Sequence, residues 1–153
     1  LEFRRVLFRS MFQSAGFWTV TKNTLLFMLL TVPVTVILGL LIAVLLNQSI
    51  NGKTVFRAIY FLPMVVAPAA VAMVWKWLFN AEYGIINIVL GALHLPSKIQ
   101  WISDPKTALL ACAIVTIWSS VGYDAILLLS GLQSISKSYY EAARIDGANS
   151  FQQ

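Results

Sequence analysis

Three apolar stretches separated by polar connectors organise this 153-residue chain. The first stretch carries no charged residue over residues 23–46, the second covers residues 58–78, and the third covers residues 107–132. At ~1.5 Å of helix per residue, the first stretch exceeds the ~30 Å hydrocarbon thickness of a bilayer. The pattern predicts an all-α membrane protein, a polytopic bundle with three transmembrane helices.

Prolines and small residues modify the first two predicted helices. Pro33 is expected to kink the first helix, in which Gly39 and Ala43 form a small-xxx-small face that favours close packing. Pro63 and Pro68 both fall within the second helix. Because prolines at membrane depth free carbonyls that neighbours or water must satisfy, we expect this helix to be broken and to face protein or a cavity.

The third predicted helix contains an ionisable residue, Asp124, well before its end. A carboxylate within the hydrocarbon is costly unless it is paired or hydrated, so Asp124 is a candidate functional residue. Three interpretations stay open: a residue lining a translocation path, a structural pair or helix hydrogen bond, and a protonated buried carboxyl. Side chains three and four positions away share a helix face with such a residue. The candidate translocation path comprises Trp118, Ser119, Tyr123 and Asp124.

Two connectors join the predicted helices. Residues 47–56 are polar and contain an Asn-Gly turn signal, whereas residues 80–106 form a longer mixed segment that follows the interfacial anchor Trp75-Lys76-Trp77. Residues 85–93 are apolar but too short to span, and we interpret them as an interfacial or re-entrant helix packed on the bundle. His94 has no second ligand at metal-binding spacing, so an ordinary polar loop residue is expected.

The composition supports the membrane class. Only 11% of the residues are charged, whereas soluble domains carry roughly a quarter. The formal net charge of +5 does not indicate nucleic-acid binding, because no basic patch interleaves with aromatic residues in a polar context. Cys112 is the only cysteine and lies in an apolar run, so it is interpreted as a small packed residue, with no disulfide, metal site or cofactor expected.

The first ten residues, LEFRRVLFRS, do not resemble the rest of the chain. They lack an initiating Met, and Met11 follows them directly. Their apolar stretch is too short and too charged for a signal peptide. We interpret residues 1–10 as a non-native leader and residues 11–153 as a partial membrane domain.

The last stretch, residues 138–153, is polar and rich in helix-ending signals. Ser138 and Glu141 have the S-x-x-E spacing of a capping box, and Gly147 stands where a left-handed helix stop is expected. A short helix, a sharp turn at Gly147 and a second helical start after Ala148 are predicted. The two alanines that follow Glu141 make a surface that another protein's backbone can approach closely.

This tail resembles the EAA motif of the membrane-spanning subunits of bacterial binding-protein-dependent ABC importers. Residues 141–147, Glu-Ala-Ala-Arg-Ile-Asp-Gly, fit the motif's Glu-Ala-Ala, three residues and Gly without a gap. Ser136 occupies a place where the family usually has Pro. Further matches extend the resemblance from about residue 23 to the end, namely 56–63, 75–79 with Gly84 and Asn87, 101–105, and 131–135.

The resemblance implies three spans of a six-span permease, with one further span before residue 23 and two after residue 153. It implies a multi-pass subunit of the bacterial plasma membrane, closest to the carbohydrate-uptake branch, which translocates a sugar or sugar-derived solute. The implied partners are an ABC ATPase subunit, a second permease subunit (identical or different) and an extracytoplasmic solute-binding protein.

The chain itself is not expected to be an enzyme. It contains no G-x-x-x-x-G-K-[ST] loop, so ATP hydrolysis is assigned to the partner subunit. The resemblance implies a cytoplasmic coupling segment over residues 137–153, in which the motion is transmitted by Glu141, Ala142, Ala143, Asp146 and Gly147.

Two other functions compete with this one. An intramembrane enzyme based on Asp124 would need a second carboxylate close by, and no other acidic residue lies in a predicted span. A passive channel or membrane scaffold would have no ATPase partner, and it would leave the capped polar tail without a purpose.

Overall fold

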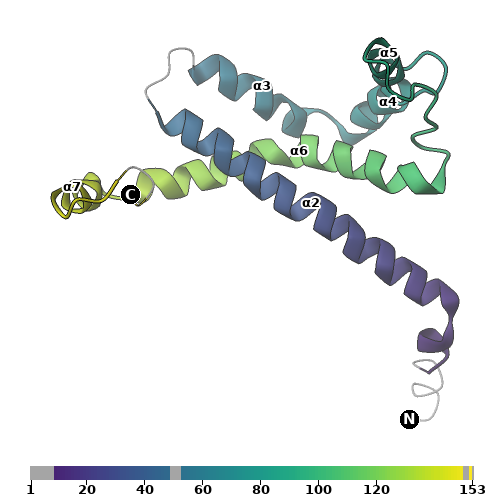
Figure 1. The fold of residues 1–153 in the computed structure, drawn as a ribbon, viewed down its shortest axis with the longest axis horizontal. Helices are drawn as coiled ribbons and strands as arrows, with labels where there is room; N and C mark the ends of the chain where they lie inside the picture. The colour runs from purple at the N-terminus through teal and green to yellow at the C-terminus, as the bar shows by residue number, and fades with distance from the viewer. Residues whose placement is uncertain (1–8, 49–52, 150–151, 153) are drawn as a thin grey trace. The chain divides into compact units, whose positions relative to one another are not determined.

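The computed structural model describes residues 9–48, 53–149 and 152, and the described part of the chain contains helices and no strand. The predicted leader falls largely outside these residues, as does the predicted Asn-Gly turn at positions 51–52. In chain order (Figure 1), the helices are α2 (Ala15–Asn47), α3 (Lys53–Val65), α4 (Pro68–Leu78), α5 (Ile85–Ala92), α6 (Pro105–Ser134) and α7 (Lys137–Ile145).

The helices bear out the predicted all-α membrane fold. Helices α2 and α6 are each long and apolar enough to cross a membrane, and residues 58–65 of α3 together with α4 qualify as a third, bent span. Helix α2 begins at Ala15, ahead of the predicted span start at residue 23, and the point where the membrane begins along the helix stays a prediction. The polar residues there do not end the helix, since the hydroxyls of Thr19 and Thr24 donate to carbonyls four residues earlier, at 3.0 and 2.9 Å.

The predicted break in the second span is confirmed, and it lies at the second of its two prolines. Pro63 stays within α3, whereas Pro68 is the first residue of α4. Ala67, which precedes Pro68, has an extended backbone with φ −56° and ψ 131°. Proline disfavours the helical conformation in the residue before it and suits the first helical position, so the chain stops and restarts here. Helix α2 continues through Pro33, and the predicted kink there stays a prediction.

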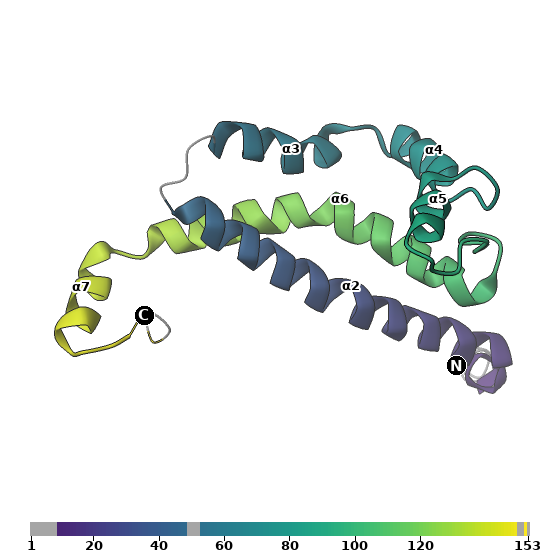
Figure 2. The same ribbon diagram turned by 45° about the horizontal axis from the view of Figure 1, so that its top comes forward.

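The helices contribute to two compact units, one formed by Leu1–Val34 with Val66–Ser119, the other by Thr35–Val65 with Ser120–Gln153. Each unit has its own apolar cluster among its described residues. The buried members are Phe79, Trp101 and Ala111 in the first unit, and Ala43, Leu46 and Leu129 in the second. Within the second unit, both views place the C-terminal half of α2 beside the C-terminal half of α6 (Figures 1 and 2).

One face of α2 is buried, and small residues form most of it. Apolar side chains on other faces are largely exposed, such as Leu29 at 69% and Ile37 at 57%. Exposed apolar side chains suit a helix surrounded by lipid, and small residues let a second backbone come close. The buried positions recur about every fourth residue, at Thr31, Thr35, Gly39, Ala43 and Leu46. The predicted face of Gly39 and Ala43 is therefore confirmed, and two threonines extend it.

Cys112 differs from its prediction. It is exposed, while its neighbours Ala111 and Ala113 are buried at 3% and 1%. Successive residues of a helix point about 100° apart, so a residue between two buried alanines is turned outward.

The connector between α4 and α6 is organised around Asn87, which is 4% exposed. The Asn87 Nδ2 donates to the carbonyl oxygens of Ala81 at 3.2 Å and Ile99 at 3.0 Å. The Asn87 Oδ1 accepts a hydrogen bond of 3.0 Å from the Trp101 Nε1. One buried amide thus joins the turn after α4, helix α5 and the segment before α6, and both of its ends have partners.

Helix α5 begins after a tight turn. The Asn80 Oδ1 accepts from the backbone N–H groups of Glu82 and Tyr83, at 2.9 and 3.2 Å. Gly84, the N-cap of α5, lies so close to the carbonyl oxygens of Leu78 and Asn80 that any side chain would overlap them. The helix predicted over residues 85–93 is confirmed at Ile85–Ala92, and its position relative to a membrane stays a prediction.

Helix α5 ends in a Schellman motif built on His94. Leu95 N–H donates to the Leu90 carbonyl at 2.9 Å, and His94 N–H donates to the Gly91 carbonyl at 3.0 Å. His94 has a φ of 58°, the left-handed conformation that usually selects Gly or Asn. The residue predicted to be an ordinary loop histidine therefore occupies the reversal that turns the chain away from α5.

Candidate functional site

Helix α7 carries the predicted coupling residues, but it begins earlier than expected. Its N-cap is Ser136, with φ −64° and ψ 138°, and the Ser136 Oγ accepts from the Ser138 N–H at 3.4 Å. The hydroxyls of Ser136 and Ser138 also lie 2.8 Å apart. The predicted capping box of Ser138 and Glu141 is therefore wrong, because both residues lie inside the helix. Of two serines two positions apart, the one with the extended backbone becomes the cap.

The C-terminus of α7 has the predicted left-handed stop. Gly147 has a φ of +82° and directly follows the C-cap, Asp146. Ala148 N–H donates to the Ala143 carbonyl at 2.9 Å, and Gly147 N–H donates to the Arg144 carbonyl at 3.1 Å. This pair of hydrogen bonds is a Schellman motif, which satisfies the last carbonyls of the helix and reverses the chain.

A second set of capping hydrogen bonds follows the turn. Asn149 Oδ1 accepts from the Gln152 N–H at 3.0 Å, and Gln152 Oε1 accepts from the Asn149 N–H at 2.9 Å. Such a reciprocal pair, three residues apart, is the capping box that begins a helix. It supports the predicted second helical start after Ala148. The N-x-x-Q spacing was its signal in the sequence.

Helix α7 exposes both motif residues and two large apolar side chains. Glu141, Ala142 and Asp146 are exposed, whereas Ala143 is half-buried and its carbonyl is used by the Schellman motif. Ile145 is 87% exposed and Tyr139 is 72% exposed. Sequence reasoning missed these two, although large apolar residues on a short, polar helix were a signal for a docking surface.

The predicted path residue Asp124 lies in the second unit, where α6 meets α2. Its side chain is half-buried. A Cβ built on Gly39 would lie 3.0 Å from the Asp124 Cβ and 3.3 Å from the Ala125 backbone nitrogen. The neighbouring Tyr123 is 49% exposed, and Ala125 is fully buried. The carboxylate is therefore carried by a helix that approaches α2 at backbone contact distance, while Tyr123 points to the outside of the unit.

The other two predicted path residues, Trp118 and Ser119, belong to the first unit. Ser119 is half-buried, and Trp118 is 40% exposed. Trp118 packs edge-on against Trp75 of α4, with ring centroids 5.5 Å apart. Further contacts, Trp75 with Phe79 at 5.2 Å and Phe79 with Trp101 at 5.4 Å, make one aromatic row. Trp118 thus has a packing role that the sequence did not reveal.

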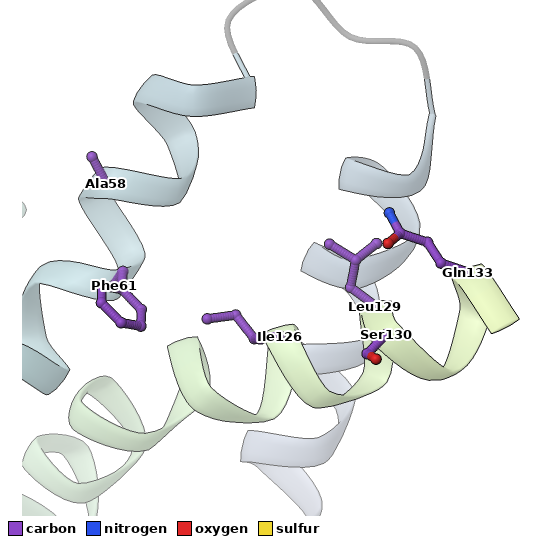
Figure 3. A pocket seen from close by; sticks show the side chains of 6 residues that line it. All are labelled: Ala58, Phe61, Ile126, Leu129, Ser130 and Gln133. Carbon is purple, nitrogen blue, oxygen red and sulfur yellow. The ribbon is translucent and has the colours of Figure 1, made fainter.

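The second unit also has a groove of about 390 Å³ between α3 and α6, which the sequence did not predict (Figure 3). Phe61 reaches into it from α3 and Ile126 from α6, so this end is apolar. Polar side chains lie farther along α6. The lining residues are Ala58, Phe61, Ile126, Leu129, Ser130 and Gln133.

The described sites consist of helix contacts and exposed side chains. No group of three or more His, Cys, Asp or Glu side chains that could hold a metal ion occurs in the part of the chain that the structure describes. The arrangement consists of a capped polar helix with an exposed face, close helix–helix contacts made by small residues, and a single acidic side chain within an apolar helix.

Comparison with known proteins identifies the family. Residues 23–153 match the model of the binding-protein-dependent transport system inner membrane component. The chain belongs to this family. A probable ABC transporter permease protein of Pyrococcus horikoshii is 39% identical over 137 residues, covering 89% of this chain and 47% of that protein. The trehalose/maltose transport system permease protein MalF of Thermococcus litoralis is 38% identical, with coverages of 89% and 46%.

A solved structure agrees with this assignment of the family. A bacterial ABC transporter involved in the import of the acidic polysaccharide alginate superimposes with a TM-score of 0.80 at 26% identity. The match covers 95% of this chain and 51% of that chain. The chain thus spans about half the length of the curated relatives and of the solved structure that it matches. The family is an inner-membrane component of transport systems, in agreement with the apolar helices.

Proposed function

We propose that this chain forms part of the membrane-spanning subunit of an ATP-driven importer of the bacterial plasma membrane. The observation that carries the proposal is α7, in which the EAA residues form a capped helix directly after α6 and end in a Schellman turn at Gly147. A channel or scaffold without an ATPase partner would not explain this exposed, capped helix. ATP hydrolysis belongs to a separate subunit in this proposal.

We further propose that the solute is a sugar or a sugar derivative. The relatives that support this include MalF of Thermococcus litoralis, named for trehalose and maltose transport, and the xylose/arabinose import permease XacH of Haloferax volcanii, which is 36% identical. A solved complex of the alginate transporter includes an oligosaccharide-bound periplasmic protein. An extracytoplasmic binding protein is therefore the proposed donor of the solute, and a second permease subunit, identical or different, completes the membrane domain.

Coupling to the ATPase is assigned to residues 137–153. Exposed Glu141 and Asp146 offer charge, and Ala142 offers a surface without bulk that a partner's backbone can approach. The hydrogen bond to the Ala143 carbonyl and the left-handed Gly147 fix the turn after α7. Helix α7 and this turn therefore move together as one rigid body when a partner displaces them. A partner that binds α7 more tightly in one state of the transporter shifts the equilibrium between inward-open and outward-open states.

The translocation path is assigned to Trp118, Ser119, Tyr123 and Asp124 of α6. Asp124 supports this assignment because a half-buried carboxylate within an apolar helix needs a polar or hydrated neighbourhood. Exposed Tyr123 adds an aromatic ring and a hydroxyl, the groups with which proteins contact sugars through stacking and hydrogen bonds.

The decisive experiment is co-purification of the protein with a candidate ATPase subunit expressed alongside it, followed by ATP-dependent uptake in proteoliposomes with a candidate binding protein present. The proposal expects a stable complex and uptake that requires ATP. Uptake without ATP, or a protein that never retains an ATPase, would identify the channel or scaffold instead.

A further inference from the structure

The exposed side of α5 is entirely apolar. Ile85 is 44% exposed, Ile88 is 59% exposed and Val89 is 51% exposed. Their spacing of three and four residues places them on one helix face. Leu93 and Leu95 continue the surface beyond the helix end, at 63% and 51% exposure.

The opposite side of α5 is held to the protein. Asn87 is buried and hydrogen-bonded to two other segments of the connector, the turn at Ala81 and the segment of Ile99 and Trp101. Ile86 and Leu90 pack against the apolar cluster of the first unit. The helix therefore cannot rotate its apolar face inward without breaking the Asn87 hydrogen bonds. These contacts of the opposite side keep the apolar face of α5 exposed.

The surroundings of this face match the boundary of a bilayer. Residues 83–97 contain no Asp, Glu, Lys or Arg. Exposed aromatic rings lie just before α5, Trp77 at 50% and Tyr83 at 56%, and such rings concentrate at membrane–water interfaces. Exposed Lys76 and Lys98 precede and follow α5 in the sequence, and Glu82 is the exposed carboxylate between them. This excess of positive charge favours contact with anionic lipid headgroups.

Length and position agree with this environment. With eight residues, α5 is ~12 Å long and cannot cross a bilayer. It belongs to the same compact unit as α4, the second half of the broken span, and only residues 79–84 separate the two helices. A docking site for a protein carries polar groups around its rim, with about one hydrogen bond per 100–200 Å² of interface. Residues 85–95 contain only two polar side chains, Asn87 and His94, and Asn87 is buried.

We propose that α5 is a membrane-surface helix whose Ile85, Ile88 and Val89 side chains insert into the acyl-chain boundary of the lipid, with Asn87 as the clamp that sets its orientation. The clamp replaces the polar face that an ordinary interfacial helix exposes to water. In this role α5 fixes the depth of the connector at the membrane surface, and the aromatic row behind it transmits that position to α6. The inference does not depend on an ATPase partner or on the solute.

The test uses the full chain in vesicles of phosphatidylethanolamine and phosphatidylglycerol. Exposed Cys112 is first replaced by Ser, and single cysteines are introduced as Ile88→Cys and Val89→Cys and labelled with a fluorophore. Lys98→Cys serves as the control at the rim, and Leu41→Cys, on the exposed face of α2, as the control for hydrocarbon. Quenching is measured with lipid brominated near the headgroup end of its acyl chains and with aqueous iodide.

The proposal expects the labels at positions 88 and 89 to be quenched by brominated lipid as strongly as the Leu41→Cys label, and shielded from iodide. Quenching by iodide to the level of Lys98→Cys would place α5 in water and overturn the proposal. Protection from both quenchers would show a protein partner on this face and would overturn it equally. A lipid-soluble carbene reagent on the unaltered chain gives an independent readout, with label expected on residues 85–93 and its absence there counting against the proposal.

Discussion

Gly122 of α6 lies directly against the backbone carbonyl of Tyr60 in α3, so closely that a Cβ on Gly122 would overlap the carbonyl oxygen. On α2, Gly39 makes a similar approach to Asp124, with its virtual Cβ 3.0 Å from the Asp124 Cβ. Two glycines therefore let α6 contact both of its neighbours in the second unit. In lipid, where helices gain little from hydrophobic burial against one another, such close packing is a main source of association.

Replacing Gly122 with Ala should destabilise the protein by about 2 kcal/mol, within the range for overpacked sites. The added methyl group meets backbone, which cannot rotate away as a flexible side chain would. The measurement is unfolding in mixed micelles followed by circular dichroism.

Gly131→Ala is the matched control, because Gly131 lies in the same helix and has no atom within 4 Å of a virtual Cβ. There the substitution should be neutral or stabilising by up to about 1 kcal/mol through helix propensity. Equal effects at positions 122 and 131 would show that the contact with Tyr60 does not govern packing.

Replacing Asn87 with Ala should lower the stability of the connector by about 1–3 kcal/mol, the cost of leaving buried polar partners unsatisfied. The Trp101 indole N–H and the Ile99 carbonyl lose the Asn87 side chain as their partner. Hydrogen exchange of residues 80–104 should increase, and Asn47→Ala, at an exposed position, should leave it unchanged. Unchanged exchange in the Asn87 variant would refute the role of this amide as the organiser.

Asp124→Asn keeps the size and hydrogen-bonding capacity of the side chain and removes its charge. If Asp124 lines the path, the variant should assemble normally while its uptake rate or KM changes by about tenfold or more, corresponding to about 1.4 kcal/mol. The measurement is solute uptake by proteoliposomes, with complex yield as the control for assembly. Uptake kinetics equal to those of the parent protein would assign Asp124 a structural role.

Gly147→Val should uncouple ATP hydrolysis from uptake. A β-branched residue at a φ of +82° costs about 1–2 kcal/mol or more, so the Schellman turn would open and α7 would lose its fixed orientation. Gly147→Asn is the matched control, since Asn tolerates the left-handed conformation. ATPase activity and uptake are measured together, and a Val variant with normal coupling would contradict the assignment of residues 137–153.

Ile145→Ser should weaken binding of the ATPase subunit by roughly tenfold or more, because burial of an Ile side chain contributes about 1.5–3 kcal/mol. The fold should be unaffected, since Ile145 is 87% exposed. Binding is measured by titration of the ATPase subunit onto the protein in nanodiscs. Ile102→Ser, at an exposed position of the connector, is the control, and similar loss in both variants would exclude a specific docking role for Ile145.

Local sequence signals determined most of the helices and turns of this protein. Long apolar stretches predicted the helices α2 and α6, Pro68 predicted the break before α4, and Gly147 predicted the turn after α7. Each of these features depends on residues adjacent in the chain, namely on hydropathy along one helix, on the fixed φ of proline, or on the conformational freedom of glycine. The resemblance to the EAA motif identified the family for the same reason, because its residues are contiguous.

Only the tertiary structure decided which residues meet. Nothing in the sequence indicated that Gly122 contacts the Tyr60 carbonyl of α3. Nothing in it indicated, either, that Asn87 bonds to residues 99–101, which fold back onto α5. Likewise, Trp118 packs against Trp75, which lies far from it in the sequence and connects it to the row of aromatic rings. The S-x-x-E spacing favoured Ser138 as the cap of α7, but the extended backbone of Ser136 makes Ser136 the cap. Such outcomes depend on distances between separate segments, and a pattern along a single chain carries no information about those distances.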